Sequence, residues 1–260
     1  MKKVLSIAGS DCSGGAGIQA DLKTMIMNGV YGMSVITALT AQNTNGVSGI
    51  FEIPPEFVKK QLDSIFEDIP PDAVKIGMVS SPLLIDAIAE GLSFRNAKNI
   101  VLDPVMVATS GSSLSSDSAV ARMIEKLFPL SGVITPNIPE AEALCGFHIE
   151  NQGDMEKAAS YLSKMTNGSV IIKGGHLKNR ADDLLWQDGK AIWYTAERIH
   201  NPNTHGTGCT LSSAIACGLA KGMPLSEAFS NAKEYISGAL SYGLDIGKGS
   251  GPLHHGYLLP

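Results

Sequence analysis

Short apolar runs rich in β-branched residues alternate with longer runs of helical periodicity, and this alternation constrains the fold more than any other feature of the sequence. Strands and helices in this order build a parallel sheet with helices packed on its faces. The strand candidates are almost continuously apolar, which is typical of strands buried on both faces. They are residues 4–8, 34–40, 73–78, 99–105, 132–137 and 169–175. The sequence therefore predicts an α/β fold with a mostly parallel central sheet.

Glycine, proline and asparagine mark the expected ends of three helices between these strands. The first helix should end at Asn28-Gly29, where glycine can adopt the left-handed cap conformation. The second should begin at Ser81-Pro82, with serine as N-cap and proline at the first helical position, and end at Gly91. The third begins in the stretch 206–209 and should stop near Gly222, because Pro224 cannot continue it.

Residues 183–194 break the alternation. Two short apolar runs flank Asp188-Gly189, and an Asp-Gly dipeptide in this position is the strongest short signal for a β-hairpin. We expect an antiparallel ribbon at an edge of the sheet. Neither an internal repeat nor a linker-like tract is visible, so residues 1–260 are expected to form a single domain.

Composition and charge argue against several classes of function. A chain of 260 residues with 44% hydrophobic content can bury a large core, and its size suits one enzyme domain. Its net charge of -5 is spread along the chain, which is unlike a surface for nucleic acid or anionic membranes. Apolar runs stay well below the roughly 18 residues of a membrane-spanning helix, and the first is too short for a signal peptide. A cytoplasmic location is expected.

The cysteines and the paired histidines do not form a metal-binding pattern. The spacing of the four cysteines shows neither a C-x-x-C pair nor the disulfide framework of a secreted protein, so reduced thiols are expected at Cys12, Cys145, Cys209 and Cys217. The adjacent His254 and His255 lack a partner motif. We interpret them as part of a solvent-exposed tail.

Glycines crowd residues 9–21, which follow the first strand, where phosphate-binding loops usually lie. Gly9 and Gly14 match part of a P-loop, but Gly15-Ala16 stand where Lys-Ser/Thr is required. The loop is not G-x-G-x-x-G, and no acidic residue ends the second strand, so a dinucleotide-binding fold is disfavoured. Asp21, placed in the first helical turn, could stabilise the helix dipole or contact a ligand.

Polar residues follow three predicted strands. Asp103 precedes Pro104 at the end of one strand, Asn137 and Glu140 follow the next, and Lys173 ends a third. These strand ends share the edge at which open α/β sheets bind ligands. Asn137 or Glu140 could merely cap the following helix, but together with Asp103 they offer the hard oxygen ligands that suit Mg²⁺. Lys173 is a natural partner for a phosphate.

The stretch Gly206-Thr207-Gly208-Cys209 opens the third helix. Its glycines let successive N–H groups converge where the helix dipole adds about half a positive charge. Such a site stabilises the charge that develops on a phosphoryl group during transfer. A cysteine there is expected to have a thiol pKa below its usual value of about 8.5, ready to act as base or nucleophile. Cys217, on the helix body, fits the core.

Seven motifs resemble, in this order, those of the hydroxymethylpyrimidine/phosphomethylpyrimidine kinases of thiamine biosynthesis, in the ribokinase-like superfamily. They are IAGSDCSGGAGIQAD, TALTAQNT, KIGM, LDPVMV, TPNIPEAEAL, IIKGGH and HGTGCT. The resemblance covers nearly the whole chain, and Cys209 distinguishes this family from sugar kinases, which have aspartate there. It implies a three-layer α/β/α fold, usually dimeric. It also implies phosphorylation by Mg·ATP of 4-amino-5-hydroxymethyl-2-methylpyrimidine, and then of its monophosphate to the diphosphate.

The same resemblance implies roles for individual residues. The pyrimidine pocket would be lined by Gly9, Asp21, Gln42, Met78, Val105 and Cys209. Gln42 would pair with the aminopyrimidine edge, and residues 206–209 would form the anion hole. The nucleotide and metal would be served by Asp103, Asn137, Glu140, Lys173 and Lys233, with Asp103 and Glu140 at the metal.

Two other functions remain open at the level of sequence. A related branch of dual-function pyridoxal kinases carries a lid cysteine, which the loop 108–116 lacks, yet both substrates bear a hydroxymethyl group on an aromatic nitrogen ring. Pyridoxal kinase is therefore the alternative activity. A non-catalytic pyrimidine-binding protein is the second alternative, although a binder needs no anion hole.

Overall fold

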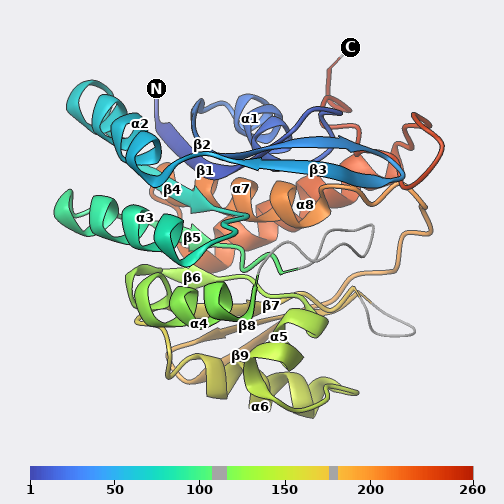
Figure 1. Cartoon of the computed structure of the whole chain (residues 1–260). Helices are drawn as coiled ribbons and strands as arrows, with labels where there is room; N and C mark the ends of the chain where they lie inside the picture. The colour runs from blue at the N-terminus through green and yellow to red at the C-terminus, as the bar shows by residue number, and fades with distance from the viewer. Residues whose placement is uncertain (107–115, 176–180, 260) are drawn as a thin grey trace.

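A continuous sheet runs through the computed structural model, which describes residues 1–106, 116–175 and 181–259 (Figure 1). Within these residues nine strands lie in the order β3-β2-β1-β4-β5-β6-β7-β8-β9. Neighbours from β2 to β7 pair in parallel, whereas β3, β8 and β9 pair antiparallel at the two edges. The strands are β1 (Lys3–Asp11), β2 (Tyr31–Asn43), β3 (Gly46–Glu52), β4 (Ala73–Ile76), β5 (Ile100–Leu102), β6 (Val133–Ile134), β7 (Ser169–Ile172), β8 (Asp183–Gln187) and β9 (Lys190–Tyr194).

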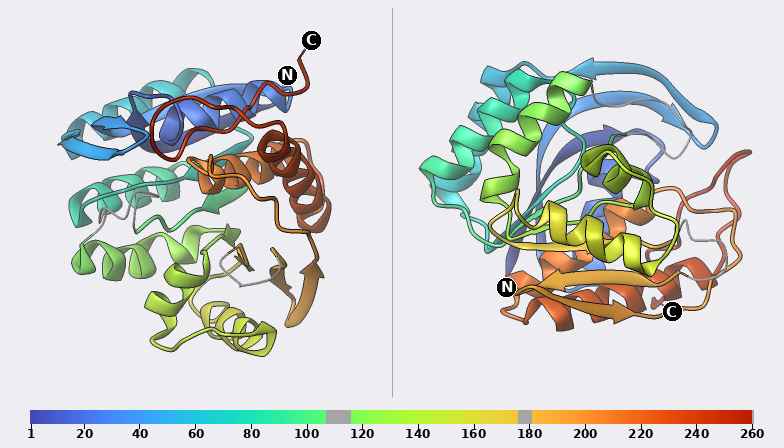
Figure 2. Two further views of the ribbon diagram at one scale, coloured as in Figure 1. Left: turned by 90° about the vertical axis from the view of Figure 1, so that its right-hand side faces the viewer. Right: turned by 90° about the horizontal axis from the view of Figure 1, so that it is seen from below.

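Helices cover both faces of the sheet (Figure 2). One face carries α1 (Gly17–Met27), α7 (Thr207–Ala220) and α8 (Leu225–Ser241). The other carries α2 (Pro55–Asp68), α3 (Pro82–Phe94), α4 (Asp117–Lys126), α5 (Ile138–Cys145) and α6 (Gln152–Leu162). The predicted three-layer α/β/α fold is therefore confirmed. Of the helices in the described ranges, none is both long and apolar enough to cross a membrane.

Two apolar cores explain why the central strands are almost continuously hydrophobic. Successive side chains of a strand point to opposite faces. Leu5 and Val74 belong to the core under α2 to α6, whereas their neighbours Val4 and Ala73 belong to the core under α1, α7 and α8. All four side chains of β4 are buried. Each central strand thus needs apolar residues at consecutive positions.

The predicted strands are all present, but their bounds differ from expectation: the runs 73–78, 132–137 and 169–175 form strands only over the shorter β4, β6 and β7. The run 34–40 is the middle of the longer β2, which pairs with β3, a strand that we did not predict. Most of β3 is exposed, so it lacks the apolar pattern of the other strands. The run 99–105 forms a strand only over β5, because Pro104 cannot donate a ladder hydrogen bond. The hairpin is confirmed, with Asp188 at φ 51° and Gly189 at φ 73° between β8 and β9.

Two of the three helix predictions hold throughout. α1 ends before Asn28 with Gly29 at φ 66°, and α7 ends before Gly222 at φ 85°. The third is wrong at its end, because α3 continues through Gly91 to Phe94. A Cβ added at Gly91 would lie 2.8 Å from a methyl carbon of Leu62, so this glycine allows α2 and α3 to pack closely.

The interpretation of His254 and His255 as an exposed tail is also wrong. His255 is only 5% exposed, and its Nε2 lies 3.0 Å from the Thr210 hydroxyl of α7. Tyr235 of α8 donates a hydrogen bond to the His255 carbonyl. Burial lowers the pKa of His255 to about 4. His255 is thus packed against α7 and α8.

A glycine in α7 permits the tight contact between α7 and α8. A Cβ added at Gly218 would lie 2.6 Å from Ala228 Cβ and 3.0 Å from Ala228 Cα, and neither atom can move without the backbone. We expect Gly218→Ala to lower the free energy of unfolding by about 1–3 kcal/mol, despite the higher helix propensity of alanine. Urea unfolding measures this change.

Gly91→Ala is the matched control for this prediction. Its new methyl group would meet the flexible end of Leu62, which can turn away. The gain in helix propensity should offset the strain, so the net change should stay below about 1 kcal/mol. Equal effects of the two substitutions would contradict the importance of the α7–α8 contact.

Candidate active site

Residues from several strand ends converge with the beginning of α7. Asp103 directly follows β5, and Lys173 directly follows β7. A Cβ added at Gly208 would lie 3.2 Å from Asp103 Oδ2 and 3.4 Å from Lys173 Nζ. The carboxyl edge of a parallel sheet is where such folds bind ligands. The strand-end charges and the glycine-rich helix start therefore form one site.

Asp103, Glu140 and Lys173 form a buried charge cluster. Lys173 Nζ lies 2.7 Å from Asp103 Oδ1 and 3.9 Å from Glu140 Oε2. Burial raises the pKa of Glu140 to about 7, with Lys173 opposing the rise and Asp103 adding to it. Burial alone would lower the pKa of Lys173, but the two carboxylates raise it. Two buried acidic groups thus share one largely buried lysine.

Asn137 and Glu140 also cap α5, which was one of the two roles that the sequence allowed for them. The Asn137 side chain accepts from the Glu140 N–H, and the Glu140 carboxylate accepts from the Asn137 N–H, both at 2.8 Å. This reciprocal arrangement is a capping box. Glu140 therefore both holds the helix start and faces Lys173, whereas the Asn137 oxygen is already engaged.

The glycine-rich turn has the conformation that anion binding needs. Gly206 is the N-cap of α7 with φ 85°, and a Cβ added there would overlap the Gly15 carbonyl. The Thr207 N–H donates to the Thr204 carbonyl at 3.2 Å. Within the described part of the chain, the N–H groups of Gly208 and Cys209 donate no hydrogen bond to a backbone carbonyl. These two N–H groups at a helix N-terminus are available to an anion.

The expectation of a lowered thiol pKa at Cys209 is wrong. Burial raises its pKa to about 11, and the charges of Asp21 and Asp103 add to this effect. Lys75 and a hydrogen bond from the Gly17 N–H oppose it but do not outweigh it. Desolvation disfavours the thiolate more than the helix start favours it. Cys209 is therefore a protonated thiol at neutral pH.

A fully buried ion pair that sequence reasoning missed lies close to Cys209. Lys75 Nζ is 2.8 Å and 3.0 Å from the two carboxylate oxygens of Asp21, and both side chains are completely buried. Ser6 of β1 and Ser213 of α7 also donate to this carboxylate. A lysine within the apolar run of β4 was the signal, since a buried lysine needs an acidic partner.

This pairing corrects the interpretation of Asp21. Helix α1 begins at Gly17 and has no acidic residue in its first turn, so Asp21 does not stabilise the helix dipole. All the contacts of its carboxylate lie inside the core. A direct contact between Asp21 and a ligand would require the exchange of one of these partners.

The other predicted residues lie around the same edge with different partners. A Cβ added at Gly9 would be 3.1 Å from Met78 Cε, so these two predicted pocket residues are adjacent. The Val105 N–H donates to the Asp103 carbonyl at 2.8 Å. Lys233 donates to Asp183 at 2.6 Å and thus is already paired. Of the loop 108–116, only residue 116 belongs to the described part of the chain.

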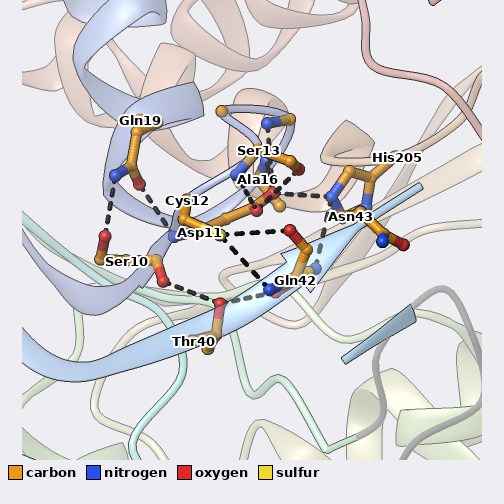
Figure 3. Close-up of polar contacts among 12 residues, drawn as sticks. Ser10, Asp11, Cys12, Ser13, Ala16, Gln19, Thr40, Gln42, Asn43 and His205 are labelled. Carbon is orange, nitrogen blue, oxygen red and sulfur yellow. Dashed lines mark hydrogen bonds and ion pairs between the residues drawn. The ribbon is translucent and has the colours of Figure 1, made fainter. Parts of the chain in front are cut away.

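Asp11 and His205 form a second pair that sequence reasoning missed (Figure 3). His205 Nε2 lies 2.8 Å from Asp11 Oδ2, and His205 immediately precedes the anion-binding turn. The ring also lies 3.4 Å from the Gln42 carboxamide. Gln42 and His205 line a cavity of about 280 Å³ together with residues 43–46, Gly249 and Ser250. The adjacency of His205 to the glycine-rich turn was the available signal.

Known proteins are similar to this chain over nearly its whole length. The family described as phosphomethylpyrimidine kinase matches residues 11–254. A hydroxymethylpyrimidine/phosphomethylpyrimidine kinase from Rhizobium meliloti is 52% identical over 255 residues, with 96% of each chain covered. The thiamine biosynthesis bifunctional protein ThiED from Geobacter sulfurreducens is 50% identical over 97% of this chain, which spans 52% of that longer protein.

A solved structure with a different named activity is also similar. The ADP complex of pyridoxal kinase from Bacillus subtilis has a TM-score of 0.91 and 38% sequence identity. The match covers 99% of this chain and 98% of that chain. The fold and the chain length are therefore shared with kinases of both pyrimidine and pyridine substrates.

Removal of one partner from the buried Lys75–Asp21 pair should strongly destabilise the fold. We expect Lys75→Met to lower the free energy of unfolding by about 3–5 kcal/mol, because Asp21 would keep a buried charge without its cation. Chemical denaturation checks this. Lys2→Met, which removes a surface pair with Asp72, should cost less than about 1 kcal/mol. Similar losses of unfolding free energy in the two variants would contradict the special importance of the buried pair.

The thiol of Cys209 should be unreactive at neutral pH. With a pKa of about 11, its alkylation by iodoacetamide should accelerate about tenfold per pH unit between pH 7 and 10. Peptide mass spectrometry separates it from the exposed Cys12, which should be labelled first. A plateau in the Cys209 rate below pH 8.5 would show that the thiolate is stabilised instead.

Proposed function

The chain belongs to the phosphomethylpyrimidine kinase family, and on this premise we propose how its site performs the reaction. The enzyme uses ATP to phosphorylate 4-amino-5-hydroxymethyl-2-methylpyrimidine, and then converts the monophosphate to the diphosphate for thiamine biosynthesis. The observation that supports the proposed site best is the position of Gly208, which lies against both Asp103 and Lys173. A non-catalytic binder would need no such anion site beside a lysine.

The reacting phosphoryl group would lie between the start of α7 and Lys173. The free N–H groups of Gly208 and Cys209 and the ammonium of Lys173 would face the charge that grows on its oxygens. Phosphoryl transfer has a loose transition state, so positioning and electrostatic stabilisation provide most of the catalysis. Gly206 and Thr207 act by shaping this turn.

Cys209 would position the substrate hydroxyl and would not act as a preformed thiolate. Its raised pKa keeps the thiol protonated, and its sulfur can accept a weak hydrogen bond from the hydroxymethyl group. In a loose transition state the new O–P bond is only slightly formed, so the attacking hydroxyl needs little general-base assistance, and its proton leaves late, to an oxygen of the transferred phosphoryl group or to water. A thiol in this place is therefore sufficient.

The pyrimidine would bind on the other side of Cys209, against Gly9, Gln42, Met78 and Val105. Gln42 would pair with the amino group and ring nitrogen of the substrate through its carboxamide. The contact between Gly9 and Met78 supports a common pocket for these residues. Asp21, the remaining predicted pocket residue, would act from the core through Lys75 and α7.

Magnesium and ATP are the proposed cofactors. Asp103 and Glu140 fit Mg²⁺, because two buried carboxylates share a single lysine and Mg²⁺ is usually held by one or two carboxylates plus phosphates. When bound, the ion would neutralise phosphate charge. Asn137 and Lys233 would reach the nucleotide only by exchanging their present partners.

We also propose that the enzyme is one kinase domain that forms a homodimer in the cytoplasm. The apolar side chains of Leu39, Ile50 and Phe51, each at least 45% exposed, lie on the β2–β3 edge and support a self-association surface there. The dispersed negative charge supports the absence of nucleic-acid or membrane partners.

Pyridoxal kinase activity is the second candidate, because the similar Bacillus subtilis structure carries that activity in its name. ADP release with hydroxymethylpyrimidine, its monophosphate and pyridoxal, each offered separately with Mg·ATP, distinguishes the two. We expect turnover with both pyrimidines and at least about tenfold lower kcat/KM with pyridoxal, since Gln42 is matched to an aminopyrimidine edge.

Lys173→Met tests the proposed site in this assay, and Lys164→Met is its matched control. Lys173→Met should abolish ADP release, because it removes the cation beside the transferring group. Lys164 lies outside the site and its loss should change little. Turnover with pyridoxal alone would favour the second candidate, and turnover with none of the three would overturn the proposed function.

A further inference from the structure

Asp11 connects three parts of the molecule through its carboxylate (Figure 3). It accepts hydrogen bonds from the backbone N–H groups of Ser13, Gly15 and Ala16, and from the Ser13 hydroxyl. Its fifth partner is His205, at 2.8 Å. Burial would raise the pKa of Asp11, but the bonds from His205, Ser13 and Ala16 lower it to about 2. Asp11 is therefore a carboxylate at every physiological pH.

The charge of Asp11 fixes the proton of His205. A carboxylate can only accept hydrogen bonds, so His205 Nε2 must carry a hydrogen whether the ring is neutral or charged. A Cβ added at Gly15 would overlap Cδ2 of this ring, which shows that the ring is held against the loop on a second side. The Nε2–H is thus fixed in position beside the cavity, with its hydrogen directed at Asp11.

This donor determines the orientation of the Gln42 carboxamide. With its nitrogen 3.4 Å from His205 Nε2, two donors would face each other. The Thr40 hydroxyl lies 3.0 Å from the other end of the carboxamide and 2.9 Å from the Ser10 carbonyl, and its one hydrogen cannot serve both. Rotation by 180° resolves both conflicts. The Gln42 NH₂ group then donates to Thr40, and the Gln42 oxygen lies beside the His205 Nε2–H, whose hydrogen points at Asp11 and reaches Gln42 only as the weaker branch of a shared contact.

The rotated carboxamide leaves one N–H and one lone pair on its outer edge. Within the described residues no further side-chain partner of Gln42 is present. An aminopyrimidine offers the complementary pair, an amino donor beside a ring-nitrogen acceptor. The order of donor and acceptor on Gln42 therefore selects one orientation of the bound ring.

We propose that Asp11 and His205 are positioning residues that set the hydrogen-bond polarity of Gln42, and thereby make the pocket specific for an amino-substituted pyrimidine. This inference rests on the proposed pyrimidine pocket. The pair acts through Gln42 and does not touch the reacting atoms. His205 also directly precedes the anion-binding turn. The same residue therefore influences both the recognition of the ring and the position of the turn.

The test compares two substrates on the same preparation of each variant. They are hydroxymethylpyrimidine and its analogue without the 4-amino group, and the readout is the ratio of their kcat/KM values. Loss of folded protein cancels in this ratio. His205→Phe keeps a ring without the donor, and we expect it to reduce the discrimination by roughly tenfold or more.

His205→Gln should restore much of the discrimination, because its NH₂ group carries two hydrogens and so supplies one donor for Asp11 and one for Gln42. His148→Phe, the same change at an exposed histidine, should leave the ratio at the wild-type value. Unchanged discrimination in His205→Phe would overturn the inference, as would equal losses in His205→Phe and His205→Gln.

Gln42→Ala separates failure of the inference from failure of the proposed pocket. It should abolish the discrimination, and His205→Phe should then add no further loss in the double variant. If Gln42→Ala leaves the ratio unchanged, Gln42 does not read the substrate and the proposed pocket is wrong. If Gln42→Ala abolishes it and His205→Phe does not, the pocket stands and the positioning role of His205 is wrong.

Discussion

The buried ion pair between Lys75 and Asp21 is the interaction on which the arrangement of the site depends. It joins β4 to α1, and the hydroxyls of Ser6 and Ser213 extend the cluster to β1 and α7. Desolvation makes such a pair expensive unless all its hydrogen-bonding groups are satisfied, and this need restricts the allowed positions of the surrounding elements. The start of α7, with Cys209, is thereby held against the central strands.

The sequence was sufficient for the features of the fold that depend on local pattern. Apolar runs and glycine caps predicted the central strands, the β8–β9 hairpin and the end of α1, because burial and turn geometry act on neighbouring residues. Exposed β3 and the continuation of α3 through Gly91 escaped prediction. Strand β3 is mostly exposed and so has no strong apolar pattern. The role of Gly91 lies in its close packing against Leu62 of α2, which the local sequence does not reveal.

The site divides in the same way. Asp103, Glu140, Lys173 and the glycine-rich turn could be placed at one edge, because parallel strands end together. The side-chain partners of Asp11, Asp21 and Lys75 could not be predicted, because each partner lies far away in the sequence. The predicted lowering of the Cys209 thiol pKa was also wrong. Burial decides the direction of this pKa shift, and burial cannot be inferred from residue spacing.

The contact between Gly15 and Gly206 has a kinetic consequence. Near it, the Asp11–His205 bond spans 194 residues of sequence, so the site can form only after a very long loop has closed. Contacts of this separation tend to form late in folding. A growing chain on the ribosome would complete most of its sheet before it could bind substrate. Activity in this protein therefore reports a finished fold, and partly folded chains would not consume ATP.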